Sequence, residues 1–367
     1  MMTMIKMQQQ TQINGQMVTL AREYRGLTQS QLAKACHVTQ QAIARLEAGV
    51  VNAVGSEKFY RISEVLSFPP EFFALNEVRL GFGSSSYFYR KKITTASERN
   101  KISGIVNLVR IHVSLMLKAV EVEGSMPLPR LLISDGYTPV KAAENLRAAW
   151  NLPDGPILNL TNLAEKAGII VVECPFGTNS IDGTSLWING LPPLIFLNDS
   201  LPPDRYRFTL AHELGHLVMH DIPHETMENE ADLFASSLLM QEIPFKVNFF
   251  QVCNTRPTIA KLLQMKPYWK VAVSAMVMRL HQIGKINDAQ KRSLFVMLSK
   301  NRMNKNEPQP FERERPRFFK VILDTALSGF SEKKEAVKRV LYSNESDFKY
   351  LYGVLDFPER PRLRVVS

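Results

Sequence analysis

One short segment, RFTLAHELGHLVMH at residues 207–220, limits the possible folds of this chain more than any other. His212 and His216 stand four residues apart, so a helix places them about 40° apart around its axis and about 6 Å apart along it. Both imidazoles can therefore reach one ion, and Glu213 lies beside them. Flanking apolar residues predict that this helix is buried: Phe208, Leu210, Leu214, Leu217 and Val218. The chain must then contain a globular domain built around this helix.

A metal site that keeps one position open for water needs three protein ligands, so two histidines are not enough. The next predicted helix, at residues 228–240, offers Glu228 as the third ligand and Glu230 as the alternative. Asp232 follows Glu228 by one turn on the same face, so its carboxylate could hydrogen-bond a ligand imidazole from outside. The sequence therefore predicts Zn²⁺ held by the two histidines and Glu228.

Two more histidines follow the pair. His220 lies one turn beyond His216, and His224 lies in the predicted loop after the helix. Either could compete for the ion, but we expect both to be rim or hydrogen-bonding residues. The metzincin arrangement requires a histidine at position 222, where this chain has Ile222, so that class of site is excluded.

A second informative segment lies at residues 20–50 and contains the pattern of two short helices joined by a turn. Its sequence is LAREYRGLTQSQLAKACHVTQQAIARLEAGV. Thr28 can cap one helix and Thr39 a second, with a short turn between them. The small side chain of Ala33 permits a close crossing of the two helices. This is the layout of a helix-turn-helix, whose second helix enters the major groove of DNA.

The outward side chains of that second helix are suited to reading DNA. Ile43 and Leu46 are predicted to face the core, which leaves the start of the helix exposed. A glutamine can pair bidentately with adenine, and Arg45 can reach phosphate or guanine. The predicted DNA-contacting residues are Thr39, Gln40, Gln41 and Arg45.

The motifs GLTQ-x-x-LA at 26–33 and V-T-x-x-x-I-x-x-L-E-x-G at 38–49 resemble the XRE family, the helix-turn-helix domains of lambdoid phage repressors. The resemblance implies an all-α, lambda-repressor-like domain that binds double-stranded DNA. XRE domains commonly act as dimers on paired half-sites, so a homodimer is expected. Two alternatives stay open: a plain helical bundle, or the same fold used for dimerisation or protein contact.

The net charge of the 367-residue chain is +10, from 45 Lys and Arg against 35 Asp and Glu. Such an excess suits a polyphosphate partner and equally fits a generally basic cytosolic protein. No apolar run approaches the ~20 residues that span a bilayer, so no membrane partner is expected. Three widely spaced cysteines without a CxxC motif favour the cytoplasm and exclude a cysteine zinc ribbon.

Between the two motifs the pattern is mixed. A Gly- and Ser-rich boundary or hinge begins at Gly81, and a connecting helix is predicted over 101–120. The basic segment 89–101 could follow the DNA backbone or form a solvated linker. Short strands separated by glycine turns are predicted before the metal helix, at 169–176, 185–190 and 192–198.

These features predict an α+β, mostly helical fold in four parts. They are an XRE-type helix-turn-helix domain, a linker with a connecting helix, a zincin-like metallopeptidase domain with a small sheet, and a helical carboxy-terminal domain, at residues 10–78, 79–132, 133–248 and 249–367. The last is assigned to sensing or substrate recognition only by family analogy. Residues 304–318, with three prolines and dense charge, are predicted to form a solvated loop.

The run PLIFLNDSLPPDRYRFTLAHELGHLVMH, followed by ENEADLFASSLLM, resembles the ImmA/IrrE family of metallopeptidases, whose members often carry an amino-terminal XRE domain. Asn198 belongs to the resemblance and is expected on an edge strand. Two departures stand out. Gln241 replaces the usual proline, which should alter only the helix end, and only eleven residues separate His216 from Glu228, which could narrow the substrate cleft.

The resemblance implies a cytoplasmic zinc endopeptidase that cleaves a repressor-type protein in a stress or mobile-element switch. Zinc held by His212, His216 and Glu228 would acidify a water and polarise the scissile carbonyl, and Glu213 would carry the proton to the leaving amine. An alternative is a transcription factor whose zincin domain is a non-catalytic sensor or protein-interaction module. In a third reading, the helix-turn-helix domain docks a repressor of the same fold.

Overall fold

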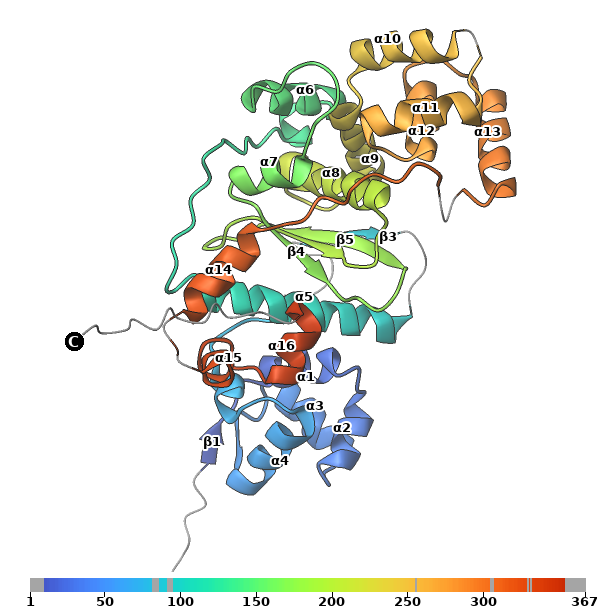
Figure 1. Cartoon of the computed structure of the whole chain (residues 1–367). Coiled ribbons are helices and arrows are strands. Elements are labelled where there is room, and N and C mark those ends of the chain that lie inside the picture. Colours follow the sequence, from blue (N-terminus) through green and yellow to red (C-terminus); the bar gives the residue numbers. More distant parts are fainter. Residues whose placement is uncertain are drawn as a thin grey trace, which may run out of the picture.

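The computed structural model describes residues 10–80, 86–90, 95–254, 256–303, 307–328, 330 and 332–353. The fold is α+β and mostly helical, as the sequence predicted. Figure 1 shows three tiers: short helices at one end, a small sheet between long helices in the middle, and further helices at the other end. Within the described residues, no helix is both long and apolar enough to cross a membrane.

The amino-terminal tier is built from short helices: α1 (Gly15–Tyr24), α2 (Gln29–Ala35), α3 (Gln40–Glu47) and α4 (Ser56–Leu66). Thr28 and Thr39 each accept a hydrogen bond from the backbone N–H of the third residue of the helix that follows, so both predicted caps are confirmed. Ile43 and Leu46 are buried as expected. The 3₁₀ turn η1 (Pro70–Ala74) and an antiparallel ribbon complete the tier, the ribbon being β1 (Gln10–Gln12) with β2 (Ala53–Gly55).

The central sheet has four strands in the order β3-β5-β6-β4. They are β3 (Ser86–Arg90), β4 (Ile170–Cys174), β5 (Ile181–Leu186) and β6 (Leu194–Asn198). Strand β6 pairs in parallel with β4 and antiparallel with β5. The expectation that Asn198 lies on an edge strand is therefore wrong, because β4 covers the outer side of β6.

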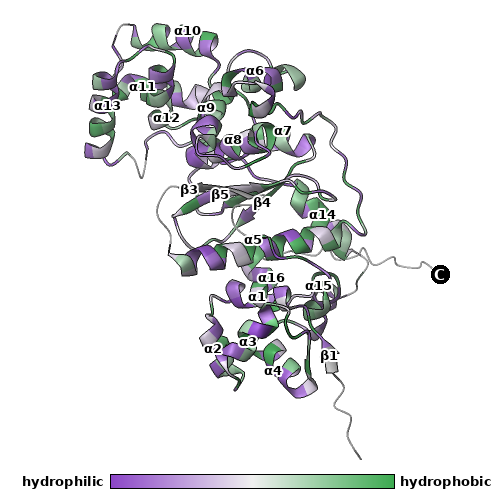
Figure 2. Ribbon diagram, turned by 180° about the vertical axis from the view of Figure 1, so that it is seen from behind, coloured by the Kyte–Doolittle hydropathy of each residue, from purple (hydrophilic) through white to green (hydrophobic). Residues whose placement is uncertain are grey.

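Both faces of the sheet are covered. Ile170 and Val172 belong to one hydrophobic core, and Val171 between them belongs to the other. Helix α5 (Ala96–Met116) lies across the first face and α8 (Pro203–Met219) across the second, as Figures 1 and 2 show from opposite sides. Because neither face meets water, the parallel pair β4 and β6 is mostly apolar in sequence, whereas β5 carries the buried polar residues Asp182, Thr184 and Ser185.

Helix α5 is a central element rather than the predicted connector. It is buried along most of its length, which is expected of a helix that is covered on all sides. A Cβ atom at Gly104 would lie 2.4 Å from the backbone nitrogen of Tyr24, so α5 crosses α1 at backbone distance. Of the predicted boundary and basic segment, residues 86–90 form β3, and residues 81–85 and 91–94 lie outside the described residues.

The far tier shares its core with α8. Around it pack α6 (Pro139–Ala149), α7 (Leu160–Lys166), α9 (Met227–Leu239), α10 (Glu242–Cys253), α11 (Ile259–Trp269), α12 (Val273–Gln282) and α13 (Asp288–Lys300), with the 3₁₀ turn η2 (Ile133–Asp135) nearby. This core reaches from the sheet to α13, so the helices after residue 249 continue the packing of the metal helix.

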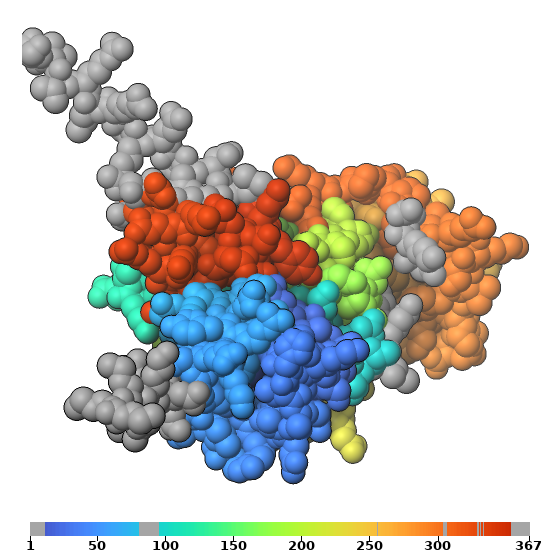
Figure 3. All heavy atoms as spheres, turned by 90° about the horizontal axis from the view of Figure 1, so that it is seen from below, coloured from blue at the N-terminus to red at the C-terminus, as the bar shows by residue number. Residues whose placement is uncertain are grey.

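The last three helices belong elsewhere. They are α14 (Phe318–Leu327), α15 (Lys333–Leu341) and α16 (Glu345–Tyr352), and their apolar residues join the core of the amino-terminal tier and α5. The sequence predicted one helical domain over 249–367, whereas the structure divides the described part of this range between two cores. Figure 3 shows residues of the amino-terminal tier and of these last helices side by side on one face.

A charged strap, residues 307–317, runs back along the middle tier to join the two groups of carboxy-terminal helices. It is a loop, as predicted, but it is only partly solvated, because two of its glutamates pair with buried side chains. The Glu314 carboxylate pairs with the buried guanidinium of Arg207 on α8. Glu307 pairs with buried Lys266 at 2.9 Å. Two charged residues of this segment therefore form ion pairs with buried side chains. Local composition cannot predict such pairs, because the partners are distant in sequence.

Candidate metal centre and DNA-facing surface

Helix α8, which carries His212 and His216, packs close to α9 because Gly215 lies between the two histidines. A Cβ atom at Gly215 would lie 2.9 Å from the ring of Phe234, so a larger residue would push the two helices apart. At the end of α8, Arg130 donates hydrogen bonds to the backbone carbonyls of Leu217 and His220, at 2.7 and 3.1 Å. These contacts set the position from which the histidines project. Nothing in the sequence around Arg130 signalled this role.

Three predicted ligands converge at one point between the helices. The Nε2 atoms of His212 and His216 lie 3.0 Å apart. Each also lies 3.5 Å from a carboxylate oxygen of Glu228, which comes from α9. Ligand atoms around a tetrahedral zinc ion are roughly 3.3 Å apart, since each bond is about 2.0–2.1 Å long. The residues present therefore fit a zinc ion in both chemistry and spacing.

Each imidazole of the pair has a partner on its other nitrogen. His212 Nδ1 lies 2.9 Å from Asp232 Oδ1. His216 Nδ1 lies 2.9 Å from His220 Nδ1, and His220 Nε2 lies 3.0 Å from Glu230 Oε2. A carboxylate thus stands behind each histidine, directly in one case and through a second imidazole in the other. Such outer hydrogen bonds fix the ring orientation of metal-binding histidines.

The electrostatics favour a positive charge where the two Nε2 atoms meet. Burial lowers the pKa of His212, but hydrogen bonds to Asp232 and Glu228 outweigh it and raise the pKa to about 9. Burial and the neighbouring His212 and His220 hold the pKa of His216 well below its usual value. The opposite directions of the two shifts show that the carboxylates around the pair favour positive charge there, and a divalent cation can supply that charge.

Glu213 lies fully buried beside the ligands, and burial raises the pKa of its carboxyl to about 8. Among the described residues, neither carboxylate oxygen makes a hydrogen bond of good geometry. The Ser185 hydroxyl on β5 lies close to Glu213 and offsets part of this rise in its pKa. A buried carboxylate without a firm partner is costly. Such a carboxylate is expected where it must exchange protons with a substrate or a water molecule that enters the site.

The four predicted DNA-contacting residues lie together on the outer surface of the amino-terminal tier. Thr39, Gln40, Gln41 and Arg45 are all exposed. The Nε2 atom of Gln40 donates to Gln29 Oε1 on α2 at 2.8 Å, which orients the start of α3. All four belong to α3 or its cap and are exposed, whereas Ile43 and Leu46 of the same helix are buried.

Negative charge is kept off this surface. Glu47 is the one carboxylate of α2 and α3, and it points inward. Its two oxygens accept hydrogen bonds from Arg22 at 2.6 and 2.8 Å. The sequence did not single out this pair. Because Glu47 is turned inward, the exposed face of α2 and α3 carries amide and basic groups and no acid, which suits contact with a phosphate backbone.

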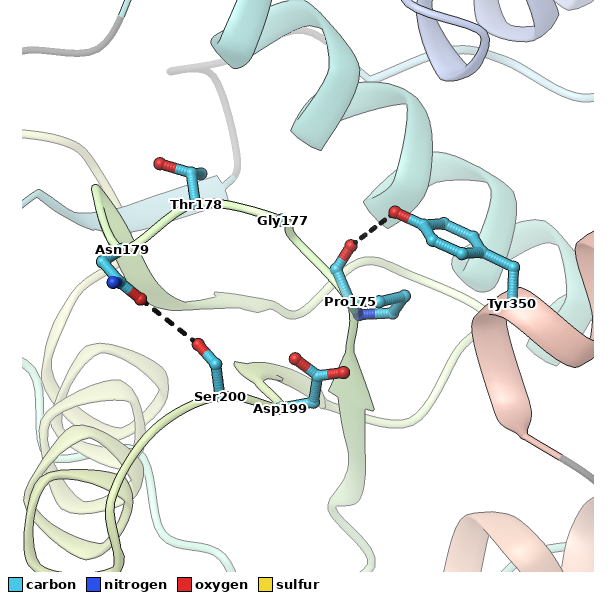
Figure 4. Close-up of a pocket in the computed structure, with 7 residues that line it drawn as sticks. All are labelled: Pro175, Gly177, Thr178, Asn179, Asp199, Ser200 and Tyr350. Carbon is cyan, nitrogen blue, oxygen red and sulfur yellow. Dashed lines mark hydrogen bonds between the residues drawn. The ribbon is translucent and has the colours of Figure 1, made fainter.

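A separate cavity of about 340 Å³ lies where β4 and β6 end, away from the histidines. Figure 4 shows the residues around it, with Asp199 and Ser200 from the end of β6 and Tyr350 from α16. The Tyr350 hydroxyl donates to the backbone carbonyl of Pro175 at 2.9 Å. None of the predicted site residues lines this cavity, so it is no part of the metal centre.

Comparison with known families follows the same division of the chain. Residues 20–73 match the family model described as helix-turn-helix, and residues 164–281 match the model of the M78 peptidases, described as an IrrE N-terminal-like domain. A search of curated proteins gave no match. The first match begins within α1 and ends within η1, and the second contains every residue of the candidate metal centre. This chain therefore combines an XRE-type helix-turn-helix domain with a metallopeptidase-type domain of the ImmA/IrrE family.

Proposed function

We propose that this protein is a DNA-binding regulator whose zinc-dependent endopeptidase domain cleaves a repressor-type protein. One arrangement carries the proposal: two imidazole nitrogens and the Glu228 carboxylate meet at one point, with the buried Glu213 carboxylate beside them. That set matches the two-histidine, one-glutamate ligand group of zinc hydrolases, which leaves a fourth position for the reaction. A purely structural zinc site would need a fourth protein ligand.

Each residue has a defined part in the proposed hydrolysis. Bound zinc supplies Lewis acidity, which makes water a usable nucleophile near neutral pH. Glu213 takes a proton from the attacking water and returns it to the leaving amine. Asp232 holds the ring of His212 through Nδ1, and His220 holds that of His216. Burial raises the pKa of the Glu213 carboxyl, which makes the ionised carboxylate a stronger base for the first transfer.

The proposed DNA contact uses the acid-free face of α3. Gln40 and Gln41 stand at its amino-terminal end, the part of a recognition helix that meets base edges. Arg45 lies one turn later and reaches phosphate or guanine. A dimer would place two such faces on paired half-sites, and this remains a proposal by family resemblance.

Two measurements on the full-length protein test the proposal. Metal analysis after dialysis should find one tightly bound zinc per chain, and incubation with the product of a neighbouring repressor gene should yield a defined cleavage. A zinc-loaded protein that leaves every candidate repressor intact, yet shifts a defined operator fragment, would support the alternative of a non-catalytic sensor. Binding to the operator should weaken steeply as salt rises, in proportion to the phosphates contacted.

A further inference from the structure

A second set of potential ligands lies next to the candidate metal centre. His220 Nε2 lies 3.0 Å from Glu230 Oε2, and His224 Nε2 lies 3.5 Å from the same oxygen. The three ligand atoms all fall within 4.8 Å of one another. His220 is buried, Glu230 is half-buried and His224 is exposed, so an ion could enter from the His224 side.

The hydrogen bonds around His224 leave its ligand nitrogen available. Thr226 Oγ1 donates to Glu230 Oε1 at 2.8 Å, so its oxygen can accept a proton from His224 Nδ1 at 3.2 Å. A neutral His224 that donates through Nδ1 carries a lone pair on Nε2, the atom that faces the glutamate. The same threonine fixes one carboxylate oxygen and leaves the other directed at the two histidines.

We propose that His220, His224 and Glu230 form a second site for a divalent cation of zinc type, and that an ion there weakens the binding of zinc at the first site. Two imidazoles and one carboxylate suit zinc better than the oxygen-seeking magnesium or calcium. The second site stands on its own three residues. Only its effect on the first site rests on the proposed zinc centre.

The opposing effect follows from one shared hydrogen bond. When His216 binds zinc through Nε2, its Nδ1 carries a proton and donates to His220 Nδ1 across 2.9 Å. His220 then has its own proton on Nε2, directed at Glu230. To bind an ion through Nε2, neutral His220 must move that proton to Nδ1, where it meets the proton of His216. Two N–H groups then face each other, and His216 loses its acceptor.

Loss of an outer partner of this kind costs about 10- to 100-fold in metal affinity. Because coupling between two sites is reciprocal, the second ion binds more weakly when the first is present. The expected pattern is therefore one tight zinc and a second, weaker zinc per chain.

Calorimetric zinc titration of the full-length protein tests this. The wild type should bind two equivalents and His224→Gln one, because His224 is exposed and supplies a ligand atom to the second site but none to the first. His281→Gln is the matched control, since His281 lies on α12 beside Asp288, and it should keep both equivalents. Glu228→Gln, which removes only a ligand of the first site, should keep one equivalent, bound about 10-fold more tightly than the second zinc of the wild type.

The outcomes separate the two proposals. One equivalent in both wild type and His224→Gln would refute the second site and leave the zinc peptidase standing. A single equivalent that is lost in His224→Gln but retained in Glu228→Gln would refute the first centre instead. If the zinc of Glu228→Gln binds no more tightly than the second zinc of the wild type, the two sites are independent and the opposing effect is wrong.

Discussion

The metal helix α8 and the DNA-facing helix α3 carry out their proposed tasks in opposite surroundings. The ligands of α8 are buried, and each has a partner behind it. The residues of α3 that would meet DNA are exposed, and one of them, Gln40, is held by a neighbouring side chain. Because the metal ligands are buried, the loss of one of their hydrogen bonds is costly. The exposed residues of α3 instead depend on the bases and phosphates that the bound DNA would supply.

The largest expected difference between the two regions concerns Glu213→Gln. This variant keeps the shape of the side chain but cannot accept the proton of the attacking water. Cleavage of the repressor-type substrate should fall by about 10²- to 10⁴-fold, as measured by the rate of product formation. Zinc content and operator binding should stay at wild-type levels. Cleavage that survives the change would show that Glu213 is not the base.

The charged strap, residues 307–317, gives the next largest effect. Glu314→Ala leaves the guanidinium of Arg207 buried without its partner, which costs about 3–5 kcal/mol in the free energy of unfolding. Denaturant unfolding measures this. Arg315→Ala is the control from the same strap, since Arg315 is largely exposed and its ion pair with Glu173 is worth little. Equal stabilities of the two variants would mean that the strap does not brace α8.

The variant Asp232→Asn tests the hydrogen bond between the Asp232 carboxylate and His212 Nδ1. An amide in place of the carboxylate weakens the hold on His212 Nδ1, and zinc affinity should fall by about 10- to 100-fold. Competition with a chromophoric chelator gives the affinity. Operator binding should not change, because α9 lies in a different tier from α3. Unchanged zinc affinity would show that Asp232 has no part in positioning the histidine.

The smallest expected effect comes from the exposed face. Gln41→Ala should weaken binding to the operator by about 1–3 kcal/mol and relax the base preference at one position, with little change in non-specific binding. Mobility shifts on operator and scrambled fragments measure both. Arg61→Ala on α4 serves as the control, because its side chain already pairs with Glu64. Equal losses on both fragments would assign Gln41 to backbone contact instead.

Local pattern was sufficient where the chemistry is local. The helical period predicted that His212 and His216 share a face, and cap residues predicted the starts of α2 and α3. Pattern failed where the partner is distant in sequence. The order of β4 and β6, the pairing of Arg207 with Glu314 and the burial of α5 all depend on segments that meet only in the folded chain. The metal and DNA roles of the site residues stay predictions.

The contact between Arg25 and Asp347 joins the first and last described helices. Tyr24 also donates to this carboxylate, at 3.1 Å and across 323 positions of sequence. On a ribosome that adds about 5–20 residues per second, Tyr24 therefore waits roughly 15–65 s for its acceptor to be made. The contact of Tyr24 and Arg25 with Asp347 can therefore form only late in synthesis, long after the helix that carries Tyr24 has been made.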